Sequence, residues 1–429
     1  MNFIFDLELK NICLELKSAQ QKLALQNAAQ KNAALLCVLD SIKRNSEKIF
    51  AANKIDVERA KKNGMSEALV DRLSLDEKKI STILDGIKIV VEREDPIGKI
   101  VAGWKTPAAL EIKQVRVPLG VVCIIYESRP NVTVDAFCLA YKSGNSILLR
   151  GSSAALNSNN ALCAAIKEGL QNSPEGISEA IELLQSTSHD DVEKILNARG
   201  LIDIVLPRGG KNLIANVVQN ARIPVIETGS GVCHLFVDED ADLQMAARIA
   251  ENAKIQRPGV CNSIEAILVH KNILQEFLPL LEDKFSGRVK IHADENCFSI
   301  LNDSAKKAGR ECIVHATNED FGNEFLDYEC VVKSAESLED AIEYINAHNT
   351  KHSECIVTKS REHARAFQQK IDAACVYVNS STRFTDGGEF GFGAELGIST
   401  QKLHARGPMG LEALTTTKFL IDGEGQIRN

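Results

Sequence analysis

The chain has 429 residues, a formal net charge of −8 and twelve cysteines. This length is enough to bury two or three cores, and 44% hydrophobic with 25% charged residues is an ordinary globular composition. The acidic balance, with no basic run interleaved with aromatic residues, argues against nucleic-acid binding. No apolar segment reaches the ~20 residues needed to cross a bilayer. Residues 1–17 lack the apolar core of a secretory signal.

The cysteines have no paired spacing, and a chain of this size does not need disulfide bonds to fold. This usage indicates a reducing compartment, so we expect a cytoplasmic protein with free thiols. The sequence has no CxxC pair that would indicate a zinc site. His348 and His352 are four residues apart, but Asn349-Thr350 interrupts the helix that a metal motif of this spacing needs. We therefore predict no metal site.

In chain order, residues 1 to about 95 are predicted to be helical, because apolar residues recur at helical spacing with few glycines. Residues 97–117 change to short alternating runs that are typical of an amphipathic β-hairpin. This hairpin carries Trp104, the single tryptophan, which is either a core residue or an interface anchor.

Two strand–turn–helix units follow the hairpin. Residues 118–126 predict a buried strand that ends at Glu127-Ser-Arg-Pro-Asn131, and the strand 146–150 leads through Gly151-Ser152-Ser153 into a helix. Arg150 beside two serines at a helix start suits contacts to phosphate or ribose. A capping serine next to a solvated arginine fits the local sequence equally well.

Two further apolar runs, 201–206 and 223–226, are each closed by glycines and followed by a helical pattern. They predict parallel strands with helical crossovers, as in an open α/β sheet, where ligands bind at the strand ends. The loops that follow are Pro207-Arg-Gly209-Gly210-Lys211 and Glu227-Thr-Gly229-Ser-Gly231. The first of these is one of three such loops after successive strands, and together the three describe a surface for a polyanionic, dinucleotide-sized ligand.

The candidate reactive centre is Cys261. Pro258, Gly259 and Asn262 frame it, so it is predicted to lie at a turn or a helix start. Nearby Arg257 and the N-terminus of a following helix would favour the thiolate form.

The other cysteines have weaker claims to reactivity. Most fall within apolar runs, and Cys297 follows acidic residues that disfavour a thiolate. Cys233 precedes His234, but neighbouring residues of a strand point to opposite faces, so this pair is a poor thiol and base. Residues 264 to about 400 predict a second α/β domain, and the cleft between domains is the expected site.

Four segments carry a family resemblance: residues 118–155, 223–234, 256–262 and, above all, the glycine-rich 379–411. They resemble the γ-glutamyl phosphate reductase family of the aldehyde dehydrogenase superfamily, and the likeness extends from about residue 20 onward. It implies an aldehyde-dehydrogenase-like α/β fold with two open sheet domains and a small β extension. The implied parts are a cofactor-binding domain (1–96 and 119–235), a catalytic domain (236–409) and a β oligomerisation segment (97–118 and 410–429).

The resemblance also implies the reaction. It predicts NADPH-dependent reduction of L-glutamyl 5-phosphate to L-glutamate 5-semialdehyde and phosphate, through a cysteine thioester, in proline biosynthesis. The protein is then expected to be a homo-oligomer, with a glutamate 5-kinase as the partner that supplies the acyl phosphate.

Site residues carry over by position. Cys261 matches the nucleophile, Glu227 the active-site glutamate, and Asn131 lies near the position of the oxyanion asparagine. The implied cofactor-binding residues are Arg150, Ser152, Ser153, Gly209, Gly210, Lys211, Gly229 and Glu324. The substrate carries a carboxylate and a phosphate, so it needs cations. The candidates, each of which has a surface salt bridge as its alternative, are Arg129, Arg257, Arg383 and Arg406.

Other interpretations share some of these features. An ordinary aldehyde-oxidising enzyme would keep Cys261 and Glu227 but need no phosphate in the oxidative direction. A regulatory NADP-binding protein would keep the glycine loops alone. A cysteine hydrolase would need a histidine partner, and no histidine motif stands out for that role.

Overall fold

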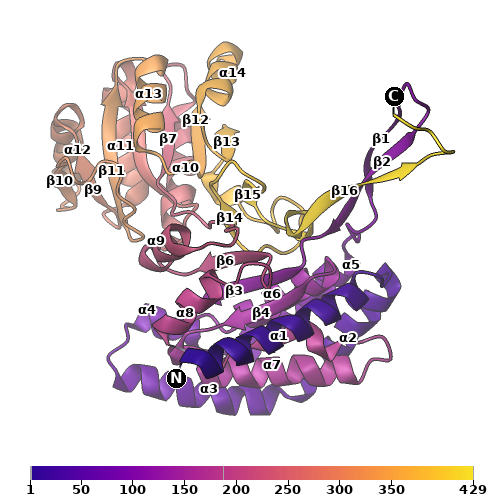
Figure 1. Cartoon of the computed structure of the whole chain (residues 1–429). Coiled ribbons are helices and arrows are strands. Elements are labelled where there is room, and N and C mark those ends of the chain that lie inside the picture. Colours follow the sequence, from indigo (N-terminus) through magenta and orange to yellow (C-terminus); the bar gives the residue numbers. More distant parts are fainter. Residues whose placement is uncertain (1, 187, 429) are drawn as a thin grey trace. The chain divides into compact units, whose positions relative to one another are not determined.

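The structure is a computed structural model that describes residues 2–186 and 188–428. The chain forms two compact units (Figure 1). The first combines Met1–Thr228 with Gly391–Gly397 and Met409–Asn429, and the second combines Gly229–Phe390 with Ile398–Pro408. None of the described helices is long and apolar enough to span a membrane.

The first unit begins with the predicted helices, which are α1 (Asn2–Leu23), α2 (Ala28–Arg44), α3 (Ser46–Lys62), α4 (Glu67–Leu73) and α5 (Glu77–Glu92). Local signals set their starts: Asn27 and Gln30 form a capping box at α2, and Asp76 accepts the Lys79 N–H at α5. A Cβ at Gly169 of α7 would lie 2.5 Å from the Val38 Cα, so glycine permits the close packing of α2 on α7. The prediction of a helical N-terminal region is confirmed.

A four-stranded parallel sheet of order β5-β4-β3-β6 forms the core of this unit. Its strands are β3 (Val121–Tyr126), β4 (Ser146–Arg150), β5 (Ile181–Leu183) and β6 (Ile204–Arg208). The helices between and after them are α6 (Asn131–Lys142), α7 (Leu156–Gln171), α8 (His189–Leu196) and α9 (Lys211–Asn220). The predicted loops therefore follow the carboxyl ends of β3, β4 and β6.

The strand predicted over residues 223–226 is wrong. Only an isolated bridge between Val205 and Val225 forms there, with the Val205 N–H donating to the Pro224 carbonyl at 2.9 Å. Proline has no N–H for a ladder, which explains why the apolar run does not extend into a strand.

The second unit is built on a seven-stranded parallel sheet of order β10-β9-β11-β8-β7-β12-β13. Its strands are β7 (Cys233–Val237), β8 (Ile264–His270), β9 (Lys290–Ala293), β10 (Ile313–His315), β11 (Glu329–Ala335), β12 (Ser353–Val357) and β13 (Cys375–Val378). Its helices are α10 (Leu243–Ile255), α11 (Leu274–Phe285), α12 (Glu295–Lys307), α13 (Leu338–His348) and α14 (Arg361–Lys370). The short pair β14 (Ile398–Ser399) and β15 (Gly407–Pro408) completes it.

The division between the units differs from the expected one. The boundary placed between residues 235 and 236 falls inside β7, which pairs with β8 and β12 of the second sheet, so the division comes earlier, after Thr228. Gly391–Gly397, expected in the second domain, belongs to the first unit.

The expected β extension forms a three-stranded antiparallel sheet of β1 (Ile100–Lys105), β2 (Glu111–Pro118) and β16 (Thr415–Asp422). Trp104 is 46% exposed and meets Phe419 edge-to-face, with ring centroids 6.0 Å apart. Its position on this surface removes the alternative that it is a core residue.

Candidate active site

Cys261 lies in the turn between α10 and β8 of the second unit, and it is only partly buried. The predicted turn is confirmed, whereas the predicted helix N-terminus is wrong, because strand β8 follows the turn. Any charge that stabilises a thiolate must therefore come from side chains or from the N–H groups of the turn.

The glycine loop 229–231 packs against this turn. A Cβ at Gly231 would lie 1.5 Å from the Cys261 carbonyl oxygen, and one at Gly229 would lie 2.4 Å from the Thr400 side chain. Glu324 accepts the Gly231 N–H through Oε1 at 2.5 Å. The structure thus brings the 229–231 loop, Glu324 and Cys261 together.

Cys233 also reaches this cluster, but as a buried neighbour. Its thiol donates to the Cys261 carbonyl at 3.2 Å and lies 3.7 Å from His352 Nδ1. Burial raises its thiol pKa well above the usual range, and Glu354 and Cys261 raise it further. His234 instead pairs with Glu354 at 2.9 Å, so the prediction that Cys233 and His234 do not act together is confirmed.

Of the four candidate arginines, Arg383 interacts electrostatically with both Cys261 and Arg257. Burial lowers the pKa of the Arg383 guanidinium and Arg257 lowers it further, whereas Asp386 and Cys261 raise it. Arg406 is bound elsewhere, to Asp372 at 2.7 Å.

Asp372 also binds Lys402 at 2.8 Å. Hydrogen bonds from Lys402 and Arg406 lower the pKa of this carboxyl to about 2. Arg406 therefore forms the surface salt bridge that was the alternative to substrate binding.

In the first unit, Glu227 is partly buried and follows the buried Ile226. The next residue, Thr228, donates from Oγ1 to the Pro207 carbonyl at 2.9 Å, which ties this segment to β6.

Arg150 ends β4 and is 8% exposed, and its Nη2 donates to the Ser188 carbonyl at 3.1 Å. Burial lowers the pKa of this guanidinium, while Asp191 raises it. The buried Ser152 Oγ has no hydrogen-bond partner among the described residues, and the Ser153 carbonyl accepts from Arg59 at 2.5 Å. A buried hydroxyl without a partner suits a ligand that brings its own polar groups.

The Gly209-Gly210-Lys211 loop leads into α9, and a carboxylate already occupies part of this helix start. The Gly210 N–H donates to Glu127 Oε2 at 2.8 Å. A Cβ at Gly209 would lie 2.6 Å from the same oxygen, so glycine is needed for this approach. The helix start therefore does bind a negatively charged oxygen, as helix N-termini do.

Asn131 begins α6, and its Nδ2 donates to Asp135 Oδ2 at 2.9 Å. Burial raises the Asp135 pKa to about 6, against the lowering effects of Asn131 and Arg208. Arg129, in the same loop, is exposed.

Sequence reasoning missed three groups that shape these sites, namely Glu127, Gln256 and the side chain of Asn262. Gln256 and Asn262 flank Cys261 in the chain, but their partner Arg383 lies more than a hundred residues later. No local signal gives that contact.

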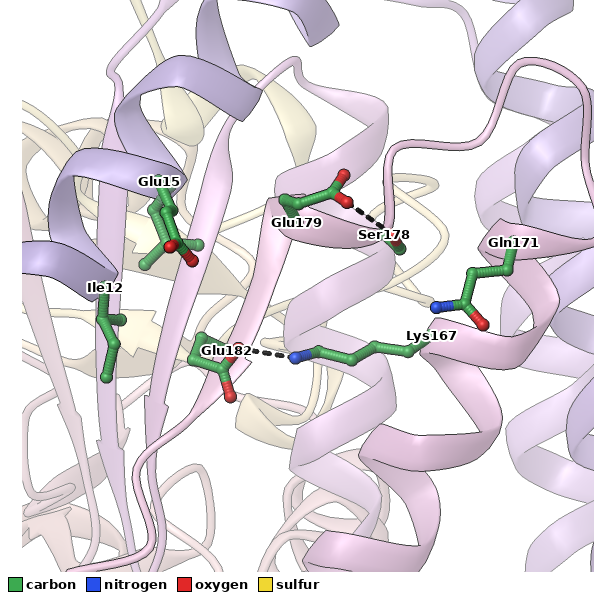
Figure 2. Close-up of a pocket in the computed structure, with 8 residues that line it drawn as sticks. Ile12, Glu15, Lys167, Gln171, Ser178, Glu179 and Glu182 are labelled. Carbon is green, nitrogen blue, oxygen red and sulfur yellow. Dashed lines mark hydrogen bonds and ion pairs between the residues drawn. The ribbon is translucent and has the colours of Figure 1, made fainter.

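A hollow of about 200 Å³ lies elsewhere in the first unit, between α1, α7 and the segment around β5 (Figure 2). Two pairs of polar groups in it bind each other: Lys167 contacts Glu182 at 2.5 Å and the Ser178 hydroxyl donates to Glu179 at 3.1 Å. None of the predicted site residues lines it. Among residues 2–186 and 188–428, no cluster of three or more His, Cys, Asp or Glu side chains could hold a metal ion.

Comparison with known proteins supports the predicted aldehyde-dehydrogenase-like fold. The model of the aldehyde dehydrogenase family matches residues 8–320 and 330–420. A gamma-glutamyl phosphate reductase of Lachnospira eligens is 50% identical over 98% of this chain and 99% of its own, and that of Clostridium acetobutylicum is 49% identical over 97% and 98%. The crystal structure of the Thermotoga maritima gamma-glutamyl phosphate reductase superposes with a TM-score of 0.94 at 43% identity, covering 98% of this chain and 100% of that one.

Proposed function

Since the chain belongs to the aldehyde dehydrogenase family and, within it, to the gamma-glutamyl phosphate reductases, we propose that it reduces L-glutamyl 5-phosphate with NADPH through a thioester on Cys261. The products are L-glutamate 5-semialdehyde and phosphate. The observation that carries the proposal is the Cys261 turn, where a partly buried thiol lies against a glycine loop in a chain of this family.

The residues account for the first half of the reaction. The Cys261 thiolate attacks the acyl carbon, a C–S bond forms, and the bond from that carbon to the phosphate oxygen breaks. Phosphate leaves as an anion, so no strong acid is needed. We assign stabilisation of the oxyanion to N–H groups of the Cys261 turn together with Asn131.

NADPH, when bound, supplies the hydride that reduces the thioester. The C–S bond then breaks as the oxyanion becomes the aldehyde carbonyl, and Cys261 is restored as the thiolate. Hydrolysis of a thioester needs an activated water, but its reduction does not. We therefore assign Glu227 to positioning or proton transfer rather than to the role of a hydrolytic base.

The first unit supports NADP binding by its chemistry. The buried Ser152 hydroxyl beside Arg150 suits a ribose or phosphate oxygen, and the Gly210 N–H at the start of α9 donates to the Glu127 carboxylate. The residues that would hold the cofactor are Arg150, Ser152, Ser153, Gly209, Gly210, Lys211, Gly229 and Glu324.

For the substrate anions, Arg129 and Arg257 are the better candidates, because the likewise exposed Arg406 is already bound to Asp372. We further propose a homo-oligomer joined through β1, β2 and β16, and a separate glutamate 5-kinase as supplier of the acyl phosphate. None of the twelve cysteines forms a disulfide bond, which fits the cytoplasm.

The test is NADP⁺ reduction by glutamate semialdehyde, measured with and without phosphate. The proposal expects activity only when phosphate is present, and loss of all activity in Cys261→Ala with NADPH binding near normal. Activity without phosphate would favour an ordinary aldehyde-oxidising enzyme. Full activity in Cys261→Ala would remove the mechanism.

A further inference from the structure

Asn262, the residue after Cys261, is 5% exposed and joined to a distant turn of the second unit. Its Nδ2 donates to the Thr385 carbonyl at 2.9 Å, and its own carbonyl accepts from Thr382 Oγ1 at 2.7 Å. Its Oδ1 accepts from Arg383 Nη1. Bonds from both side chain and backbone therefore fix the Cys261 turn against residues 382–385.

The same bonds orient Arg383. Its Nε donates to Gln256 Oε1 at 3.1 Å while Nη1 donates to Asn262. The guanidinium is thus held between two residues that flank Cys261 in the chain, and it interacts electrostatically with Cys261 and Arg257.

A buried hydroxyl network supports the turn that carries Arg383. Thr385 Oγ1 lies 2.7 Å from Ser353 Oγ and 2.7 Å from Tyr377 OH, and Ser353 Oγ lies 2.8 Å from His352 Nδ1. Thr385, Ser353 and His352 are fully or almost fully buried. A network of this kind keeps the turn in one arrangement before any ligand binds.

We propose that Arg383, positioned by Asn262 and Gln256, is the cation that keeps Cys261 in the thiolate form. The inference rests on the proposed function, in which Cys261 is the nucleophile, and it gives Arg383 a role other than binding the substrate. A fixed cation replaces the helix N-terminus that the sequence predicted and the fold lacks. Nearby positive charge favours a thiolate, and a partly buried site screens it less than bulk water does.

The other charged groups around Cys261 do not replace this role. Arg257 is exposed, so solvent screens its charge. The carboxylates have N–H donors of their own: Asp386 accepts from Gly388 at 2.8 Å and Glu324 from Gly231 at 2.5 Å. Cys233 stays a neutral thiol because burial raises its pKa well above the usual range.

The test is the rate of alkylation of Cys261 by iodoacetamide as a function of pH, read on the Cys261 peptide by mass spectrometry in the full chain without ligands. Arg383→Gln should move the midpoint of the profile up by about one pH unit and slow alkylation below the midpoint ~10-fold. Arg383→Lys should restore part of the shift, because lysine keeps the charge but not the two-pronged geometry. Gln256→Ala and Asn262→Ala should give smaller shifts in the same direction.

Arg288→Gln is the matched control. It removes one cation from the same unit. The Arg288 side chain donates only to Glu251 and the Lys284 carbonyl among the hydrogen bonds described, and the midpoint should not move. An unmoved midpoint in a folded Arg383→Gln variant would overturn the proposal and leave Arg383 as a substrate ligand. If that variant does not fold, unmoved midpoints in both Arg383→Lys and the exposed-site variant Gln256→Ala would overturn it. Alkylation needs neither NADPH nor substrate, so failure of the proposed reaction is a separate result.

Discussion

Replacing Gly231 with alanine should disable the Cys261 turn without removing a reacting atom. The new Cβ would lie 1.5 Å from the Cys261 carbonyl oxygen, 2.4 Å from its carbonyl carbon and 2.7 Å from its Cα. All three are backbone atoms, so no side chain can rotate away. An ordinary contact is about 3.5 Å, so the loop and the turn would have to separate by roughly 2 Å.

This displacement sets the expected size of the effect. A misplacement of about 1 Å at a reacting group can cost ~100-fold in rate. We therefore expect kcat of Gly231→Ala to fall by at least ~100-fold in the phosphate-dependent assay with glutamate semialdehyde. The pH profile of Cys261 alkylation should change as well, because the turn leaves its bonds to the Arg383 segment.

Gly86→Ala in α5 is the control for a glycine replacement that has room. The nearest atom to its Cβ, Asp135 Oδ1, is 3.9 Å away, and alanine at a helical position should stabilise the fold by about 1 kcal/mol. Its kcat should stay at the wild-type value. A Gly231→Ala variant with near-normal kcat and an unchanged alkylation profile would refute the claim that this close approach positions Cys261.

Two further predictions concern stability and assembly. Burial lowers the His352 pKa to about 4, so as pH falls from about 6.5 to 4 the unfolded chain takes up a proton that the folded chain does not, and the free energy of unfolding falls. Urea unfolding measures the free energy of unfolding at pH 7.5 and at pH 5. Its decrease between these two pH values should be about 2 kcal/mol smaller in His352→Gln than in the wild type, and equal decreases would contradict this assignment. The exposed Trp104–Phe419 pair lies on the three-stranded sheet, so a Trp104→Arg/Phe419→Asp variant should give a smaller particle by light scattering, whereas an unchanged mass would exclude this surface as the interface.

Features that depend on neighbouring residues in the chain were predictable from the sequence. Hydrophobic runs that end at loop residues predicted β3, β4 and β6 and the loops after them, and the Pro258-Gly259 pair predicted the turn at Cys261. The errors arose where a local pattern had two outcomes. Ile223–Ile226 has the composition of a strand, but Pro224 cannot donate to a ladder and only one bridge forms.

Contacts between distant segments were not predictable in this way. The expected source of positive charge near Cys261 was a following helix, but the chain continues into β8. The cation comes instead from Arg383, in the turn after β13. Only the order of strands in the sheet, with β7 between β8 and β12 and β13 at the edge, brings these segments together. Strand order depends on packing across the whole unit, which spacing along one segment does not encode.

The choice of Cys261 among twelve cysteines depends both on local sequence patterns and on contacts between distant segments. Exposure alone leaves three candidates, since Cys37, Cys261 and Cys312 are the cysteines that are only partly buried. Cys37 lies within α2, and burial and Glu282 raise the pKa of Cys312. Cys261 alone of the three lies in a turn whose backbone packs closely against a glycine loop. The next residue, Asn262, also binds an arginine, Arg383. A reactive thiol needs both access and a fixed cation, and only the folded chain supplies the second.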